Sequence, residues 1–157
     1  MADFIAVVYL LENPDPYMAA SPPCALFASG LAAVGIAFED DAGQLKIPAR
    51  HPEVGDLLIT FDDGEITVFV GHFTHRHFAS TAEDCVRDAL EYVCGIWQDE
   101  WILWAHPGGA GGSYRVGAES DPVEDTPSPD EEVVRYVWSG PYDPLPGESP
   151  VRPQRDS

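Results

Sequence analysis

The clearest alternation of apolar and polar positions lies in residues 55–71, GDLLITFDDGEITVFVG. Two alternating runs flank Asp63-Gly64, a residue pair typical of a two-residue hairpin turn in which both positions have positive φ. This loop length pairs Ile59 with Val68 and places an unbroken apolar face on the two strands. That face comprises Leu57, Ile59, Phe61, Ile66, Val68 and Val70. The pattern therefore predicts a β-hairpin with one face against a core.

A helical pattern follows in the stretch STAEDCVRDALEYVCGIWQDE. Ser80 precedes Glu83 by three residues, which is the spacing of a capping box at a helix N-terminus. Apolar residues then recur on one face with a period of about 3.6, at Ala82, Cys85, Val86, Ala89, Leu90, Val93 and Trp97. We therefore predict one principal helix over about residues 80–98, packed by this face on the hairpin.

Shorter patterns predict the remaining elements. Strands are expected at the N-terminal FIAVVYLL, WILWAH (101–106), SYRVG (113–117) and VVRYVWSG (133–140), with a loop at PGGAGG (107–112). The stretch 25–38 fits either a helix from Cys24 to about Ala33 or a helix that runs into a strand. Together these elements predict the α+β class: a mainly antiparallel sheet with one principal helix packed on one face.

The length of 157 residues suits a single hydrophobic core. We predict one α+β domain over residues 1–140, which includes an acidic, Pro-rich loop at 118–132. The remaining residues, 141–157, give little reason for ordered structure, so we predict a flexible tail there.

The chain is strongly acidic, with 27 Asp and Glu against 8 Lys and Arg and a formal net charge of −19. Residues 118–132 hold seven of these acids, so the rest of the chain is acidic as well. Such a surface repels the phosphates of nucleic acids and anionic lipid heads, and it attracts basic proteins. Composition therefore favours a basic protein partner over nucleic acid or membrane, and it leaves the oligomeric state open.

The cysteines indicate a compartment. Cys24, Cys85 and Cys94 are widely spaced, odd in number and without a Cys-x-x-Cys motif, a pattern that suits free thiols in a reducing cytosol. The apolar run FIAVVYLL has only eight residues and no basic flank, so it predicts neither a signal peptide nor a membrane span. We expect a cytoplasmic protein.

Three histidines lie close together in VFVGHFTHRHF (68–78), namely His72, His75 and His77. If a single strand continues through this stretch, alternation places His75 and His77 on one face with Phe73 and turns His72 away. Two imidazoles that share a strand face can bind a metal ion when a third ligand is present.

The histidines support two interpretations. The first is a metal-dependent enzyme, with ligands drawn from His72, His75, His77 and His106. The second is a polar strand end whose imidazoles hydrogen-bond to a partner, with no metal and no other cofactor. We favour the second interpretation because no third ligand follows at a recognisable spacing, and we keep the enzyme as the alternative.

Other motifs of enzyme chemistry are absent from the sequence, including GxSxG and GxxxxGK[ST]. Cys85 follows the histidines but falls on the apolar helix face, so we predict a core role for it. The tryptophans are predicted to lie mainly in the core, at Trp97, Trp101 and Trp104. One of them, with Tyr114 or Tyr136, could line a partner-binding surface, since aromatic residues anchor interfaces.

The hairpin and histidine stretch DGEITVFVGHFTHRHF, followed by the capped helix, resembles small acidic bacterial proteins of the polymorphic-toxin immunity type. The resemblance covers about residues 55–100. It implies a protein that acts by binding a basic partner such as a toxin, so no catalytic residue is carried over. For partner binding we predict His75, His77, Glu83, Asp84 and Asp88.

Overall fold

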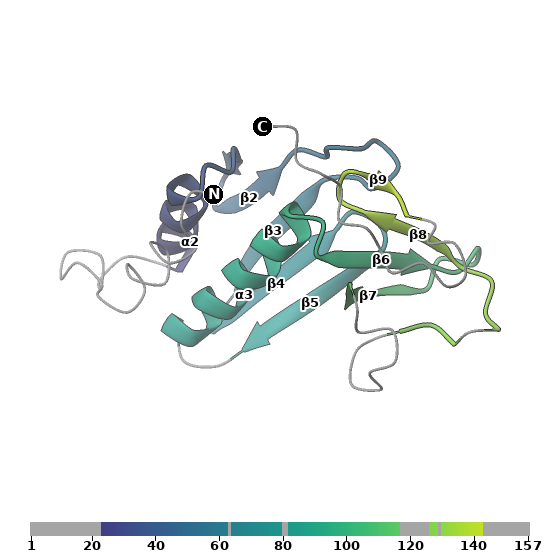
Figure 1. Cartoon of the computed structure of the whole chain (residues 1–157). Coiled ribbons are helices and arrows are strands. Elements are labelled where there is room, and N and C mark those ends of the chain that lie inside the picture. The colour runs from purple at the N-terminus through teal and green to yellow at the C-terminus, as the bar shows by residue number, and fades with distance from the viewer. Residues whose placement is uncertain (1–22, 63, 80–81, 117–125, 129, 143–157) are drawn as a thin grey trace. The chain divides into compact units, whose positions relative to one another are not determined.

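The computed structural model describes residues 23–62, 64–79, 82–116, 126–128 and 130–142 (Figure 1). The chain divides into two compact units, which we describe separately. The described residues of unit 1 lie within Met1–Pro48, Asp56–Phe69 and Arg76–Val93, and those of unit 2 within Ala49–Gly55, Val70–His75 and Cys94–Ser157. One domain over residues 1–140 therefore stays a prediction.

The α+β class is confirmed, with two antiparallel sheets and two described helices. The larger sheet, sheet A, has the order β1-β2-β3-β4-β5. Its strands are β1 (Glu39–Asp41), β2 (Gln44–Ile47), β3 (Leu57–Asp62), β4 (Glu65–Val70) and β5 (Thr74–Ala79). The short pair β1–β2 was not predicted; its turn uses positive φ at Ala42 and Gly43.

The predicted hairpin is confirmed as β3 and β4. Gly64 has a φ of 76°, as the turn requires, while Asp63 lies outside the described residues. The predicted apolar face is turned inward, because its members other than the half-buried Phe61 are at most 2% exposed. The opposite face of the hairpin carries Phe69, which is 37% exposed.

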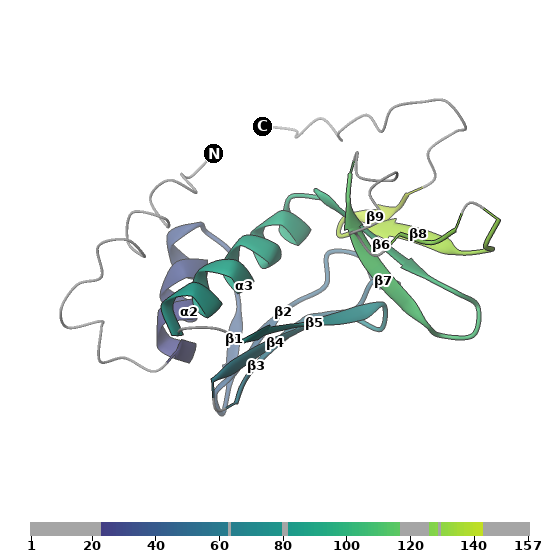
Figure 2. The same cartoon turned by 90° about the horizontal axis from the view of Figure 1, so that it is seen from below.

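Helix α3 (Ala82–Trp97) covers the inner face of sheet A in unit 1 (Figures 1 and 2). Its Tyr92 ring lies 5.8 Å from the Phe78 ring of β5, and the Arg76 guanidinium lies 4.7 Å above the same Tyr92 ring. Within the predicted apolar stripe, Cys85, Val86, Ala89, Leu90 and Val93 are buried and Trp97 is half-buried. Ser80 and the Ala82 side chain lie outside the described residues.

Helix α2 (Pro23–Ala33) confirms the simpler interpretation of residues 25–38, a helix that ends at Ala33. It contacts α3 where Gly30 approaches Leu90, so closely that a Cβ on Gly30 would lie 2.5 Å from Leu90 Cδ1. The predicted N-terminal strand FIAVVYLL lies outside the described residues. No helix in the described ranges is long and apolar enough to cross a bilayer.

Unit 2 contains the smaller sheet, sheet B, in the order β7-β6-β8-β9. Its strands are β6 (Trp101–Ala105), β7 (Gly111–Arg115), β8 (Val134–Val137) and β9 (Gly140–Pro141). The prediction of one strand over 133–140 is wrong, because the chain reverses after Val137 and Val137 pairs with Gly140. The Tyr142 N–H then donates to the Arg135 carbonyl at 2.9 Å, so ordered structure continues past residue 140.

The aromatic residues of unit 2 divide between core and surface. Trp101, Trp104 and Trp138 are buried, which agrees with the predicted core role of the first two. Tyr114 is also buried, at 3% exposure, so of the two tyrosines considered for a binding surface only Tyr136 is partly exposed. Of the predicted acidic loop, the described parts are 126–128 and 130–132, where the Ser128 N–H donates to the Glu131 carboxylate at 2.8 Å.

Candidate functional site

The histidine stretch is not one continuous strand. Strand β4 ends at Val70, Gly71 adopts a φ of 50°, and the Phe73 N–H donates back to the Val70 carbonyl at 3.0 Å. His72 therefore lies in a turn, and β5 begins after it. Phe73 is 3% exposed, whereas His75 and His77 are exposed. The prediction that Phe73 shares a face with these two histidines is therefore wrong. A glycine with positive φ allowed the chain to turn here.

His77 belongs to a polar group on the outer face of sheet A. Because Phe78 contacts α3, its neighbour His77 points to the opposite side. The His77 Nδ1 lies 2.7 Å from Glu65 Oε1 and 3.2 Å from Thr67 Oγ1. The hydrogen bond from His77 lowers the pKa of the Glu65 carboxyl below its usual value. The imidazole is thus held in a fixed orientation on the surface.

The acidic residues predicted for partner binding lie elsewhere on unit 1. Asp84 and Asp88 flank Arg87 on α3, at 2.9 and 3.4 Å from its Nη2 atom, and each carboxylate is about half exposed. Because α3 covers the inner face of sheet A, these acids and His77 are on opposite sides of the sheet. The Glu83 side chain lies outside the described residues. Of the five predicted residues, His77 therefore lies apart from Asp84 and Asp88.

The alternative metal site is not assembled in the described parts of the chain. No three His, Cys, Asp or Glu side chains within these parts are close enough to hold a metal ion. His106 lies at the end of β6, with its Nε2 3.9 Å from a Glu131 oxygen. His72 instead stacks on the Phe73 ring at 4.5 Å.

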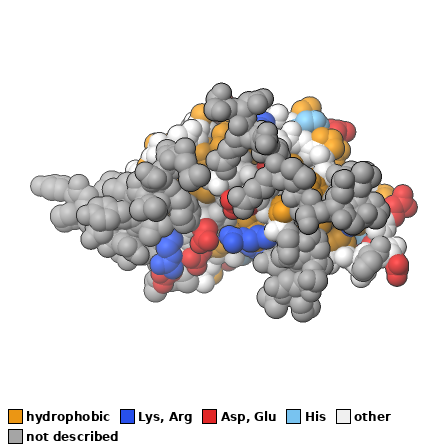
Figure 3. Space-filling model, viewed as in Figure 1, with side chains coloured by type: hydrophobic (Ala, Val, Ile, Leu, Met, Phe, Trp, Pro, Cys, Tyr) orange, Lys and Arg blue, Asp and Glu red, His pale blue; other side chains and the backbone are white. Residues whose placement is uncertain are grey.

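Most of the described basic side chains pair with carboxylates or lie over aromatic rings. Lys46, the single lysine, has its Nζ 3.3 Å from Asp56 and 3.7 Å from Glu39, and the hydrogen bond to Asp56 is the main cause that raises the pKa of Lys46. Three arginines lie over rings, as the pairs Arg50–Trp97, Arg76–Tyr92 and Arg115–Trp101. Figure 3 shows, on one face of the molecule, basic side chains beside acidic ones. The acids outnumber these bases and dominate the surface charge.

A second polar group, which we call the Glu53 site, lies in unit 2. Glu53 is exposed on the loop between β2 and β3, and its Oε2 accepts a hydrogen bond from the Tyr136 hydroxyl of β8 at 3.0 Å. His51 lies on the same loop, where its Nδ1 accepts the Glu53 N–H at 3.3 Å. The hydrogen bond to Glu53 raises the pKa of the Tyr136 phenol, so this hydroxyl remains a donor at neutral pH.

Four aromatic rings form a row beside this carboxylate. His72 stacks on Phe73, Phe73 lies 5.3 Å from Tyr136, and Tyr136 lies 6.1 Å from His51, between ring centroids. Phe73 is buried, Tyr136 and His51 are half-buried, and His72 is exposed. We call these residues the ring row. It places two half-buried rings, Tyr136 and His51, next to an exposed carboxylate.

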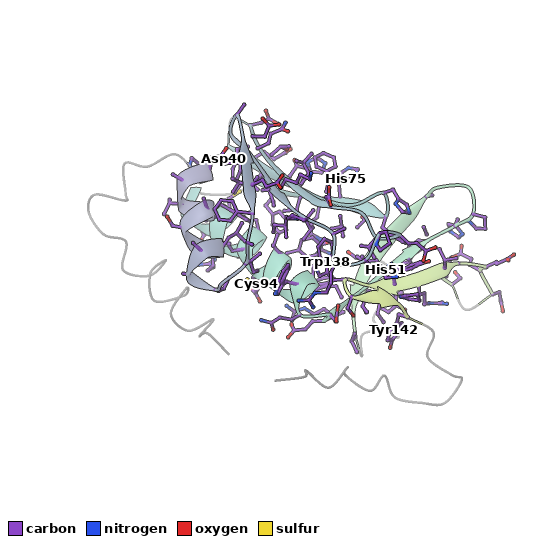
Figure 4. All side chains as sticks on the ribbon, turned by 90° about the horizontal axis from the view of Figure 1, so that it is seen from above. Asp40, His51, His75, Cys94, Trp138 and Tyr142 are labelled. Carbon is purple, nitrogen blue, oxygen red and sulfur yellow. The ribbon has the colours of Figure 1, made fainter. Side chains whose placement is uncertain are left out.

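Glycines allow the backbone around the Glu53 site to pack closely. Gly55 and Gly71 both have positive φ and approach each other so closely that a Cβ on Gly55 would lie 3.1 Å from the Gly71 Cα. His51 is labelled in Figure 4, and a Cβ on Gly140 of β9 would lie 3.4 Å from its ring carbon Cδ2. The backbone therefore packs closely on both sides of Glu53, at distances that leave little room for a Cβ.

Sequence reasoning missed His51 and Glu53 and identified only Tyr136 as a surface candidate. Glu53 and Tyr136 are separated by 83 residues, so no local spacing connects them. The one available signal was HPEVG (51–55), a short polar turn with Pro and Gly between two strands.

Comparison with known proteins assigns neither a family nor a function to the chain. No protein-family model matches the chain, and no curated protein or solved structure is significantly similar to it. The function must therefore be argued from the residues themselves.

Proposed function

We propose that this chain is a small cytoplasmic binding protein that sequesters a basic protein partner. The observation that carries the proposal is the arrangement of charge. The described bases are largely engaged with carboxylates or rings, while carboxylates such as those of Asp40 and Asp41 on the edge strand β1 are exposed. An approaching protein therefore meets negative charge, which accelerates and orients the encounter with a basic surface.

A toxin is the partner class that best fits this proposal. Many toxins are basic nucleases, and an acidic protein can cover the cationic site that binds their substrate. The resemblance of residues 55–100 to immunity proteins supports the same class. A gene for a toxin-like basic protein immediately upstream would support it further.

Binding should weaken strongly as salt rises. We expect affinity for a fluorescent ten-residue lysine peptide to fall at least about tenfold between about 0.05 and 0.5 M NaCl, because the Debye length shrinks roughly threefold over this range. Fluorescence anisotropy measures this affinity. A glutamate peptide of equal length should not bind at any salt concentration.

Charge variants test whether the acids cause this binding. The double variant D84N/D88N should weaken binding of the lysine peptide, and K46Q should leave it unchanged or slightly stronger because Lys46 is already paired. Affinity capture from the source cells should then yield a basic protein that salt elutes. Salt-independent binding, or a captured partner that is itself acidic, would contradict the proposed function.

A further inference from the structure

We propose that the Glu53 site binds one arginine side chain of the partner, with Glu53 as the counter-ion and the ring row as the stacking surface. This inference rests on the proposed function, since it names the contact that anchors a basic partner. It goes beyond overall charge, because it assigns a single recognition site to unit 2.

The Glu53 carboxylate is oriented by a hydrogen bond and can accept further hydrogen bonds from a cation. Its Oε2 is held by the Tyr136 hydroxyl at 3.0 Å, and no described residue hydrogen-bonds to its Oε1. Because Tyr136 fixes the orientation of the carboxylate, less side-chain entropy is lost when a ligand binds. A guanidinium can donate to Oε1 and to the remaining lone pair of Oε2 at once, as arginine does with carboxylates elsewhere.

The rings favour guanidinium over ammonium. Arginine is planar and stacks on aromatic faces while its N–H groups bond to an acceptor in the same plane, whereas the lysine ammonium is a strongly hydrated point charge. Tyr136 and His51 are each half-buried, with centroids 6.1 Å apart, and the buried Phe73 ring lies 5.3 Å from that of Tyr136. An exposed carboxylate and two half-buried rings thus lie together, which are the groups that a guanidinium uses for pairing and stacking.

The arginines nearest in sequence do not fill the site. Arg50, three residues before Glu53, lies over the Trp97 ring at 4.7 Å. Arg135 precedes Tyr136 on β8, so strand alternation directs it to the opposite face of sheet B. The site is therefore left to a cation that comes from outside the described chain.

The test is an NMR titration of the full chain with N-acetyl-arginine-N-methylamide. We expect saturable shifts of the His51 and Tyr136 ring signals at millimolar ligand, and affinity at least fivefold lower in Glu53→Gln. The Tyr136→Phe variant keeps the ring and loses the hydroxyl that orients Glu53, so it should weaken binding two- to threefold. Both residues are at least partly exposed, and an unchanged backbone spectrum verifies the fold of each variant.

Glu131→Gln is the matched control. Glu131 is also an exposed carboxylate near a histidine of unit 2, but its contacts are with His106 and Ser128 rather than with the ring row, so its loss should not change the affinity. The N-acetyl-glutamine analogue, which lacks the positive charge, should produce no saturable shift. Equal affinity in wild type and Glu53→Gln, or equal shifts with the glutamine analogue, would overturn the proposed arginine site.

The lysine-peptide assay separates this inference from the proposed function. If E53Q binds arginine as wild type does while the lysine peptide still binds in a salt-dependent manner, the arginine site is wrong and the acidic binding function stands. If the arginine analogue binds at Glu53 but the lysine peptide does not bind at low salt, the proposed sequestering function fails instead.

Discussion

Gly71→Ala should lower the free energy of unfolding by about 3 kcal/mol or more. Gly71 has a φ of 50°, which is strained for any residue with a Cβ. A Cβ at this position would also overlap the Val54 carbonyl oxygen and lie 2.8 Å from the Val54 carbonyl carbon. Backbone cannot rotate aside as a side chain can, so the loop 51–55 or the turn itself must move. Urea unfolding followed by circular dichroism measures the loss.

Gly64→Ala is the control that isolates the overlap. Gly64 also has a positive φ, of 76°, but a Cβ there would meet no atom within 4 Å. Its substitution should cost only the conformational strain, about 1 kcal/mol. If the two variants lose the same stability, the close approach of Gly71 to Val54 is not present in solution.

Trp138→Ala should cost about 3–5 kcal/mol of unfolding free energy, the range for deletion of a large buried aromatic side chain. Trp138 is 0% exposed, and its ring centroid lies 6.5 Å from that of Trp97. The neighbouring turn is fixed by the Ser139 N–H, which donates to Asp99 at 2.9 Å, so the backbone has little freedom to fill the cavity.

Trp138→Phe should be much milder, at about 1–2 kcal/mol. The phenyl ring keeps most of the apolar contact, and the indole N–H that is lost has no hydrogen-bond partner in the described parts of the chain. Val134→Ala, at a position 52% exposed on the same hairpin, should change stability by less than about 0.5 kcal/mol. A Trp138→Ala variant as stable as Val134→Ala would rule out the buried position of Trp138.

Elements with a long, regular pattern could be predicted from the sequence. The β3–β4 hairpin carries an apolar face with the two-residue period of strands, and α3 carries one with the period of a helix. The turn and cap residues of these elements indicate the same structures. The pair β1–β2 escaped prediction because Glu39–Asp41 is three consecutive acids, a composition that disfavours strands. Tertiary pairing with β3, for example Leu45 opposite Ile59, overrides that local preference.

The candidate sites were harder to predict for a physical reason. The stretch 68–78 has the composition of a strand throughout, so the turn at Gly71 depends on φ rather than on hydrophobic pattern. Phe73 is buried, and His72 lies in the turn rather than in β5. The contact of Glu53 with Tyr136 arises from the fold of unit 2, and neither residue differs locally from an ordinary surface residue.

Successive segments of the chain alternate between the two units, and this alternation constrains the order of folding and the effect of proteolysis. The chain passes from one unit to the other five times, so unit 1 is complete only once Val93 has been synthesised, and the short segments Ala49–Gly55 and Val70–His75 must wait for strands β6 to β9. Domains that are continuous in sequence can fold one after another as they leave the ribosome. Here two segments of unit 2 lie within the sequence of unit 1, so no single proteolytic cut can divide the chain into two intact units.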